Sequence, residues 1–76
     1  MKHEYICVEQ RFINAIGRYT SYGIYYKEYE DNILDDVDCD KSFVEYVVAQ
    51  LNKYQVSPVH VKDVVENMLA VKYSAR

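Results

Sequence analysis

A chain of 76 residues is enough for one small domain, residues 1–76, with one hydrophobic core. Half of the residues are hydrophobic and 28% are charged, which is typical of globular rather than disordered proteins. The net charge of −3, with nine Lys and Arg spread along the chain, argues against direct binding to nucleic acid, which needs clustered cations. No apolar run is long enough for a membrane span and no signal peptide is visible, so we expect a cytoplasmic protein without membrane contact.

Two segments in the first half of the chain have the composition of β-strands. Residues 4–13 and 20–30 are rich in β-branched and aromatic side chains, and residues 14–18 favour a turn between them. A second turn at residues 31–32 and a short strand over residues 33–37 would complete an antiparallel, three-stranded meander.

Alternation along the second strand predicts which of its side chains face the core. We assign the side that carries Ile24 to the core, because it bears no charge before Glu28. Tyr25 and Tyr29 are then predicted on the opposite, outer face of the sheet. The predicted core side consists of Tyr22, Ile24 and Tyr26.

Apolar residues repeat at helical spacing from Phe43 onward, which predicts an amphipathic helix. The sequence leaves two alternatives for the residue at which this helix begins. Either Asp38 or Asp40 is the N-cap residue, or Ser42 and Glu45 form a capping box one turn later. The stripe expected to face the core consists of Val44, Val47, Val48, Leu51 and Tyr54.

A second helix has a clearer start. Ser57 is a favourable N-cap residue and Pro58 suits the first helical position, while Val56 and Val61 have the spacing of a hydrophobic staple. Two helices with one apolar stripe each must bury those stripes on the sheet and on one another. The sequence therefore predicts an α+β fold, in which a three-stranded antiparallel meander is followed by a two-helix hairpin on one sheet face, in the order β-β-β-α-α. The second stripe consists of Val61, Val64, Val65, Met68 and Leu69.

Seven of the twelve acidic residues lie between residues 28 and 40, with no basic residue among them. Asp36, Asp38 and Asp40 have the spacing of the first ligands of a calcium-binding loop. However, Lys41 stands where that loop needs glycine, and Val47 where it needs glutamate, so we predict no calcium site. Two interpretations stay open: a solvated sheet edge with a helix cap, or a surface that meets a basic partner or imitates nucleic-acid phosphate.

The histidines and cysteines lack the signature of a catalytic or metal site. A metal at His60 would need converging ligands, and His3 is the only other histidine. Cys7 and Cys39 have no local signature of a nucleophile, and we expect both to be free thiols, buried or half-buried, in a reducing compartment. We therefore predict no catalytic residue, no cofactor and no metal, and we do not expect an enzyme.

Several short motifs resemble one family. They are a Tyr-Gly-Ile strand, a Leu-Asn pair at the end of the first helix, and a second helix that begins Ser-Pro-hydrophobic-His and continues Asp-Val-Val-Glu. The matching residues are Tyr22, Gly23, Ile24, Leu51, Asn52, Ser57, Pro58, His60, Asp63, Val64, Val65 and Glu66. Over roughly residues 20–70 the chain resembles the DUF6514-type family of short proteins of unknown function from clostridia and related Firmicutes. The resemblance implies a bacterial cytoplasmic protein of unassigned role, supplies no catalytic residues, and is compatible with a mobile-element or phage origin.

These observations lead to the hypothesis of a small, non-enzymatic interaction or regulatory module that acts on a protein partner. Tyrosines would supply anchoring area and the acids would steer association. The candidate partner surface consists of Tyr25, Tyr29, Glu28, Glu30, Asp31, Asp35 and Asp36. The alternative is an acidic inhibitor that mimics nucleic acid and binds a nucleic-acid-handling protein. Homo-oligomerisation through unpaired sheet edges is a further expectation.

Overall fold

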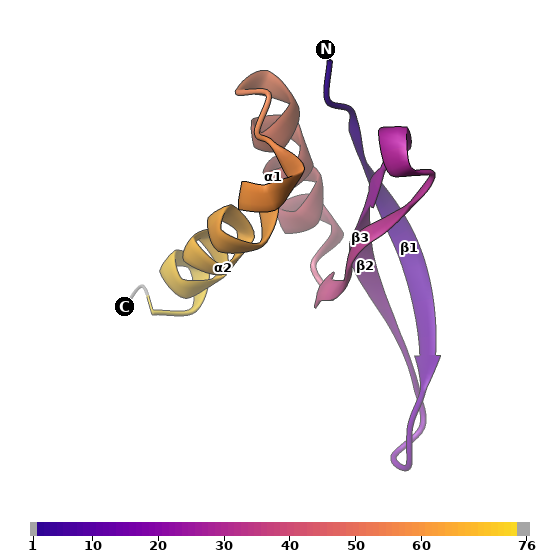
Figure 1. Cartoon of the computed structure of the whole chain (residues 1–76). Coiled ribbons are helices and arrows are strands. Elements are labelled where there is room, and N and C mark those ends of the chain that lie inside the picture. The colour runs from indigo at the N-terminus through magenta and orange to yellow at the C-terminus, as the bar shows by residue number, and fades with distance from the viewer. Residues whose placement is uncertain (1, 75–76) are drawn as a thin grey trace.

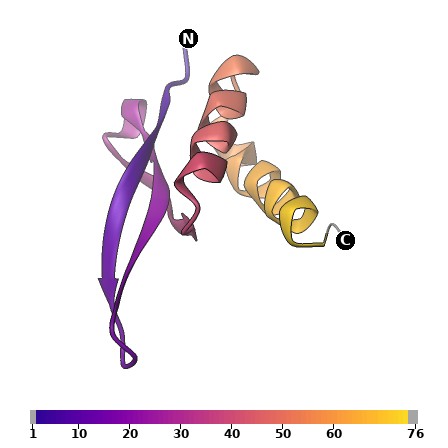
Figure 2. The ribbon, with the colours of Figure 1, turned by 180° about the vertical axis from the view of Figure 1, so that it is seen from behind.

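Three antiparallel strands form one sheet in the order β1-β2-β3, and two helices lie on one side of it (Figures 1 and 2). The computed structural model describes residues 2–74 and confirms the predicted order β-β-β-α-α. The elements are β1 (Tyr5–Ile13), β2 (Arg18–Tyr26), the 3-10 turn η1 (Lys27–Tyr29), β3 (Asp31–Asp38), α1 (Lys41–Lys53) and α2 (Pro58–Ser74).

The β1–β2 hairpin closes where the sequence predicts a turn. Asn14 and Gly17 exchange two backbone hydrogen bonds of 2.8 and 3.2 Å, and the Asn14 side chain accepts from the N–H groups of Ile16 and Gly17. Gly17 has a φ of 151°, which glycine adopts at little cost. No residue from 9 to 20 is buried, and this part of the hairpin, hereafter the arm, extends beyond the helices (Figure 1).

The register of the two strands fixes which side chains face the helices. Tyr5 pairs with Tyr26 and Cys7 with Ile24, so the odd-numbered residues of β1 and the even-numbered residues of β2 share the helix side. The predicted core side of β2 is confirmed, because Ile24 and Tyr26 are buried and Tyr22 packs against the core.

The connection from β2 to β3 differs from the prediction. β2 ends at Tyr26 instead of continuing to residue 30, and the chain turns through η1. Glu30 then takes the left-handed conformation, with φ 54°, and donates its N–H to the Lys27 carbonyl. The turn breaks the alternation of the strand, so Tyr29 is not on the outer face: its ring packs edge-on against Tyr26, 4.6 Å between centroids. The predicted outer-face position of Tyr29 is therefore wrong.

β3 is longer than the predicted segment and is irregular. Tyr22 pairs with Asp38 and Ile24 with Leu34, so the single residue between them on β2 lies opposite three residues of β3. The extra residues form a bulge in which Asp36 has a φ of 51°.

The helix starts resolve the alternatives that the sequence leaves open. Asp40 is the N-cap residue of α1, and its carboxylate accepts a hydrogen bond from the Phe43 N–H at 3.3 Å. α2 begins at Pro58, as predicted. Tyr54 was expected in the core stripe, but α1 ends at Lys53 and Tyr54 is 66% exposed.

One hydrophobic core lies between the helices and the sheet. Tyr5 is its largest fully buried side chain, and its hydroxyl donates to the Val56 carbonyl at 2.5 Å. Burial raises the pKa of Tyr5 to about 12. The core consists of Tyr5, Ile24, Tyr26, Val44, Val47, Val48, Leu51, Val61 and Val65.

Two side-chain amides, one in the last turn of α1 and one just after the helix, bind the chain at the start of β1. The Asn52 amide accepts from the Tyr5 N–H at 2.8 Å and donates to the Tyr5 carbonyl at 2.9 Å. Gln55 makes the same pair of bonds, 2.8 and 2.9 Å, with the backbone of His3. Each amide takes the place of a peptide group of a neighbouring strand. We call this pair the amide clamps; they fix α1 to the sheet and cover the first part of the β1 edge.

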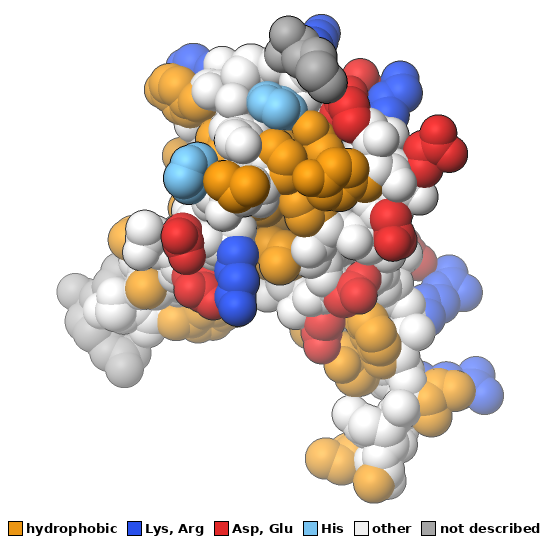
Figure 3. Space-filling view, viewed as in Figure 1, with side chains coloured by type: hydrophobic (Ala, Val, Ile, Leu, Met, Phe, Trp, Pro, Cys, Tyr) orange, Lys and Arg blue, Asp and Glu red, His pale blue; other side chains and the backbone are white. Residues whose placement is uncertain are grey.

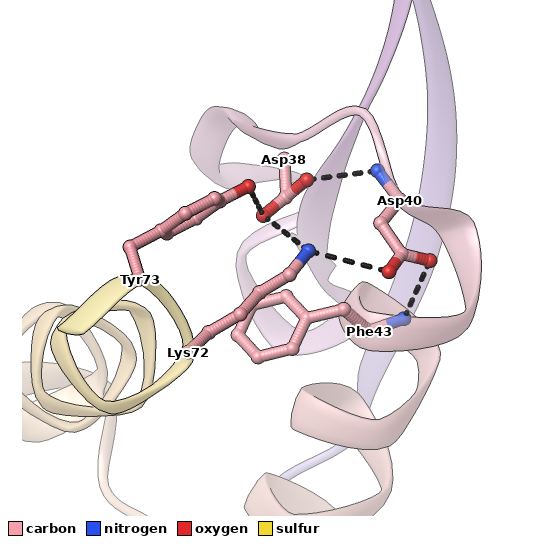
Figure 4. A network of polar contacts seen from close by, with 5 residues as sticks. All are labelled: Asp38, Asp40, Phe43, Lys72 and Tyr73. Carbon is pink, nitrogen blue, oxygen red and sulfur yellow. Dashed lines mark hydrogen bonds and ion pairs between the residues drawn. The ribbon is translucent and has the colours of Figure 1, made fainter. Parts of the chain in front are cut away.

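A second polar contact ties the end of α2 to the start of α1 (Figure 4). The buried carboxylate of Asp38 accepts from Lys72 at 3.0 Å, from the Tyr73 hydroxyl at 2.6 Å and from the Asp40 N–H at 2.8 Å. Lys72 also reaches Asp40 at 3.2 Å and lies 4.6 Å from the centre of the Phe43 ring. The Lys72 side chain is 26% exposed, so solvent screens this network only in part.

The network favours the charged forms of Asp38, Asp40 and Lys72. It favours the neutral form of Tyr73, because the hydrogen bond to Asp38 raises the pKa of Tyr73. Burial opposes ionisation of Asp38, but hydrogen bonds from Tyr73, the Asp40 N–H and Lys72 outweigh it and lower the pKa of Asp38. Hydrogen bonds from the Phe43 N–H and Lys72 lower the pKa of Asp40. Burial acts to lower the pKa of Lys72, but the bonds to the two carboxylates raise it.

We predict that Asn52→Ala destabilises the fold by about 2 kcal/mol, because two partly buried hydrogen bonds to Tyr5 are lost. Hydrogen exchange should also show loss of protection at the Tyr5 amide. Asn67→Ala, at an exposed position of α2, is the matched control and should leave both measurements near wild type. Unchanged protection of Tyr5 in Asn52→Ala would contradict the role of the clamp.

We also predict that the Asp38 network contributes stability that acid removes. The folded pKa of Asp38 is lowered, so its contribution is fully present above the unfolded value of about 3.9 and is lost as the pH falls through the folded pKa. Asp38→Asn should therefore lower stability at neutral pH, by on the order of 1–3 kcal/mol, and flatten the fall in stability below about pH 4. Urea unfolding across this pH range measures both effects, with Asp63→Asn, exposed on α2, as the control. Parallel pH profiles for Asp38→Asn and wild type would contradict the assignment.

Candidate partner surface on the outer face of the sheet

The outer face of the sheet carries apolar side chains that no helix of residues 2–74 covers. In the pairing of β1 with β2, Ile6 lies opposite Tyr25 and Phe12 opposite Tyr19. The rings of Phe12 and Tyr19 stack with centroids 5.2 Å apart, and Ile6 is 41% exposed. Val8 lies between these pairs, and the polar side chain of Gln10 separates it from Phe12. We call these apolar side chains of the hairpin the apolar strip.

Gln10 crosses this face from β1 to β3 over the central strand. Its side-chain amide donates to the Asp35 carboxylate at 2.6 Å and accepts from the Asp36 N–H at 2.8 Å. The Tyr19 hydroxyl adds a third link, because it donates to the Asp36 carboxylate at 2.8 Å and this bond raises the pKa of Tyr19. The bulge of β3 is thus fixed from the outer side of the sheet.

Gly23 lies directly beneath this crossing. A Cβ atom at residue 23 would lie 2.6 Å from the Gln10 side-chain oxygen and 2.7 Å from the Leu34 carbonyl oxygen, closer than real Cβ contacts allow. Glycine is needed here for space and not for its backbone conformation. The Tyr-Gly-Ile motif includes this residue, but nothing in the sequence indicates its contact with Gln10.

Ser21, next to Gly23 on the same face, is fully buried, and its hydroxyl has no hydrogen-bond partner among the residues that the structure describes. Ser21 pairs with Gln10 across the β1–β2 ladder. A small side chain at residue 21, like the glycine at residue 23, leaves room for the Gln10 side chain.

The acidic segment has a structural as well as an electrostatic role. Six of its seven carboxylates accept hydrogen bonds within the chain, as Glu28 does from the Glu4 N–H and Asp31 from the Asn32 N–H. Only Asp38 is buried; the other acids of the segment are exposed. Figure 3 shows acidic side chains along the strand side of the molecule, above the arm.

The structure brings together only part of the predicted surface. Tyr25, Asp35 and Asp36 share the outer face, with Asn32 opposite Tyr25 in the β2–β3 ladder. Tyr29 lies instead at the η1 turn, where it is 63% exposed, next to the predicted acids of that turn. The predicted residues outside the shared outer face are Glu28, Tyr29, Glu30 and Asp31. Ile6, Phe12 and Tyr19 were missed, although alternation along residues 4–13 could have found the first two.

The cysteines and histidines form no recognised site in the part of the chain that the structure describes. Both thiols are free; Cys7 is half-buried, with its pKa raised by burial, whereas Cys39 is exposed, contrary to the prediction for it. Four surface hollows, of about 180 to 520 Å³, have neither His60 nor a cysteine in their walls. Within residues 2–74, no three His, Cys, Asp or Glu side chains are placed to hold a metal ion, and no helix could cross a membrane.

The fold and this surface define a small α+β protein with one sheet face open. Residues 1–71 match the family of unknown function DUF6514, and the chain belongs to this family. The match also includes β1, which lies outside the range of residues 20–70 that carries the short motifs. No curated protein and no solved structure matches the chain.

Several of the motif residues have a structural role. Gly23 admits Gln10, Leu51 is fully buried, and Asn52 forms an amide clamp. Pro58 starts α2, and Val65 is buried in the core. The motif therefore describes the assembly of the fold and leaves the function to be argued from the surface.

We predict that Gly23→Ala destabilises the protein by about 2–4 kcal/mol, because the new methyl group collides with Gln10 and with the rigid Leu34 carbonyl. Gln10→Ala should relieve the first collision only, so the double variant should recover part of the loss. Chemical unfolding of the wild type, both single variants and the double variant gives this coupling. A Gly23→Ala protein as stable as wild type would contradict the crossing.

Proposed function

We propose that this protein is a small, non-enzymatic interaction module that binds a protein partner through the outer face of its sheet. The observation that carries the proposal is the apolar strip of the hairpin beside the acidic bulge of β3, on a face that the helices leave open. Exposed apolar groups next to one sign of charge are typical of recognition surfaces.

The tyrosines and acids have different parts in this proposal. Tyr25 and Tyr19 offer rigid rings with polar tips, which make efficient contact area. Asp35 and Asp36 are already held by Gln10 and by the Tyr19 hydroxyl, so binding would cost little side-chain entropy. The partner we propose therefore presents a complementary surface with apolar and basic side chains.

A second candidate is an acidic inhibitor that occupies the nucleic-acid site of another protein. The exposed acids of the segment favour it, because no basic residue lies among them between residues 28 and 40. The apolar strip beside them favours the first candidate, because a phosphate mimic needs charge and not rings.

We place the protein in the cytoplasm. Two free thiols fit a reducing compartment, and Cys39 is exposed without a disulfide partner.

The proposal predicts that binding depends on the outer face and not on the helices. Tyr25→Ala should speed dissociation from a partner purified from the native host. Asp35→Asn with Asp36→Asn, which keeps side-chain oxygens for the hydrogen bonds from Gln10 and Tyr19, should slow association and reduce its salt dependence. Surface-binding kinetics at two salt concentrations measure both effects.

Tyr46→Ala, at an exposed position of α1, is the matched control and should bind like wild type. Loss of binding in the control with full binding in Tyr25→Ala would overturn the proposal. Competition of the partner's binding by nucleic acid would support the inhibitor instead.

A further inference from the structure

The two outer edges of the sheet are protected to different degrees. Along β3, the bulge and the acids Asp31, Asp35 and Asp36 disrupt the regular row of backbone groups that another strand would need. At the start of β1, the amide clamps occupy the backbone of His3 and Tyr5. The remainder of the β1 edge, from Cys7 to Ile13, has neither a bulge nor a side-chain amide bound to its backbone among the residues that the structure describes.

At every second residue of this segment, the backbone N–H and C=O groups point away from β2. The Asn14–Gly17 pair and the bond from the Lys27 N–H to the Glu4 carbonyl show that even-numbered residues of β1 bond to β2. In an antiparallel ladder the intervening residues turn their N–H and C=O groups to the other side. Cys7, Glu9 and Arg11 thus present these groups at the open edge.

The side chains along this edge are complementary in charge to those of the same edge in a second copy. If two copies pair antiparallel with Gln10 opposite Gln10, the register brings Glu9 opposite Arg11 of the second copy and Cys7 opposite Ile13. Both ion pairs form at once because of the two-fold symmetry. A shift by one pair in either direction would place Glu9 against Glu9 or Arg11 against Arg11, so the charges select one register.

The length of the open edge fits the same register. Pairing from Cys7 to Ile13 uses all of the edge, and it stops where the Asn52 amide occupies the backbone of Tyr5. Ile13, which is 77% exposed in the single chain, would gain Cys7 as a cross-strand neighbour. On the outer face, Val8 would join the stacked rings of Phe12 and Tyr19 of the second copy.

From this geometry we propose that the protein forms a symmetric homodimer, in which the β1 edges of two copies pair over Cys7–Ile13 into one six-stranded sheet. The proposal goes beyond the partner surface, because it uses the sheet edge and not the outer face. The Arg11–Glu9 ion pair within one chain, at 3.1 Å, is exposed, so little is lost when it is exchanged for pairs between copies. The contact is small, so we expect a dissociation constant on the order of micromolar.

The first experiment measures molecular mass by sedimentation equilibrium over a wide range of concentration. Wild type should approach twice its 9.0 kDa chain mass. Arg11→Glu should remain monomeric, because each of its Glu9 side chains would face a glutamate. The matched control is the charge swap Glu9→Arg with Arg11→Glu, which should dimerise again. A wild type that stays monomeric, or a dimer that Arg11→Glu does not weaken, would overturn the proposal.

The second experiment tests the register by disulfide formation. In a Cys39→Ser background, Ile13→Cys should form a disulfide with Cys7 of the second copy under mild oxidation, because cross-strand Cα atoms lie about 5.5 Å apart. Ile16→Cys, at the tip of the arm and 97% exposed, should not. Equal cross-linking of both variants would refute the register. Partner binding through the outer face would be unaffected by that result, which keeps the two proposals separate.

Discussion

The size of the chain is the constraint on which the rest of the structure depends. With 76 residues it can build one sheet and one layer of helices, and its shortest dimension is only 19 Å. One face of the sheet and parts of both edges therefore stay open. The contacts that hold the molecule together, and the surfaces through which it could act, both follow from this shortage of covering elements.

Side chains take the place of missing secondary structure at several points. Asn52 and Gln55 complete the hydrogen bonding of the β1 edge as another strand would, and Gln10 links β1 to β3 over the central strand. At the far end, Lys72 joins α2 to Asp38. These contacts join elements that are far apart in the chain. The bonds of Asn52 and of Asp38 also satisfy part-buried polar groups that would otherwise be costly to bury.

The acidic segment shows how one stretch of sequence can serve two purposes. Asp38 and Asp40 work inside the molecule, since they hold Lys72 and start α1. Asp35 and Asp36 shape the bulge of β3 and still present their charge to solvent. An acid with a structural role can therefore also take part in recognition of a partner. Because these carboxylates disrupt the β3 edge, the β1 edge is the one better suited to pairing with another strand.

The sequence by itself determined the local elements. Alternation and helical spacing predicted the order β-β-β-α-α. Asn14 and Gly17 predicted the hairpin turn, and Pro58 predicted the start of α2. These features depend only on residues that are neighbours in the chain. Tyr25 was placed correctly on the outer face for the same reason.

Only the tertiary structure decided the rest. The turn at η1 moved Tyr29 off the outer face, and the Gln10–Gly23 contact, the amide clamps and the Asp38–Lys72 pair join residues far apart in the chain. Such contacts depend on how finished elements pack and in which register, and neither spacing nor composition within one element carries that information. Tertiary packing also decided which acids are structural and which sheet edge stays open.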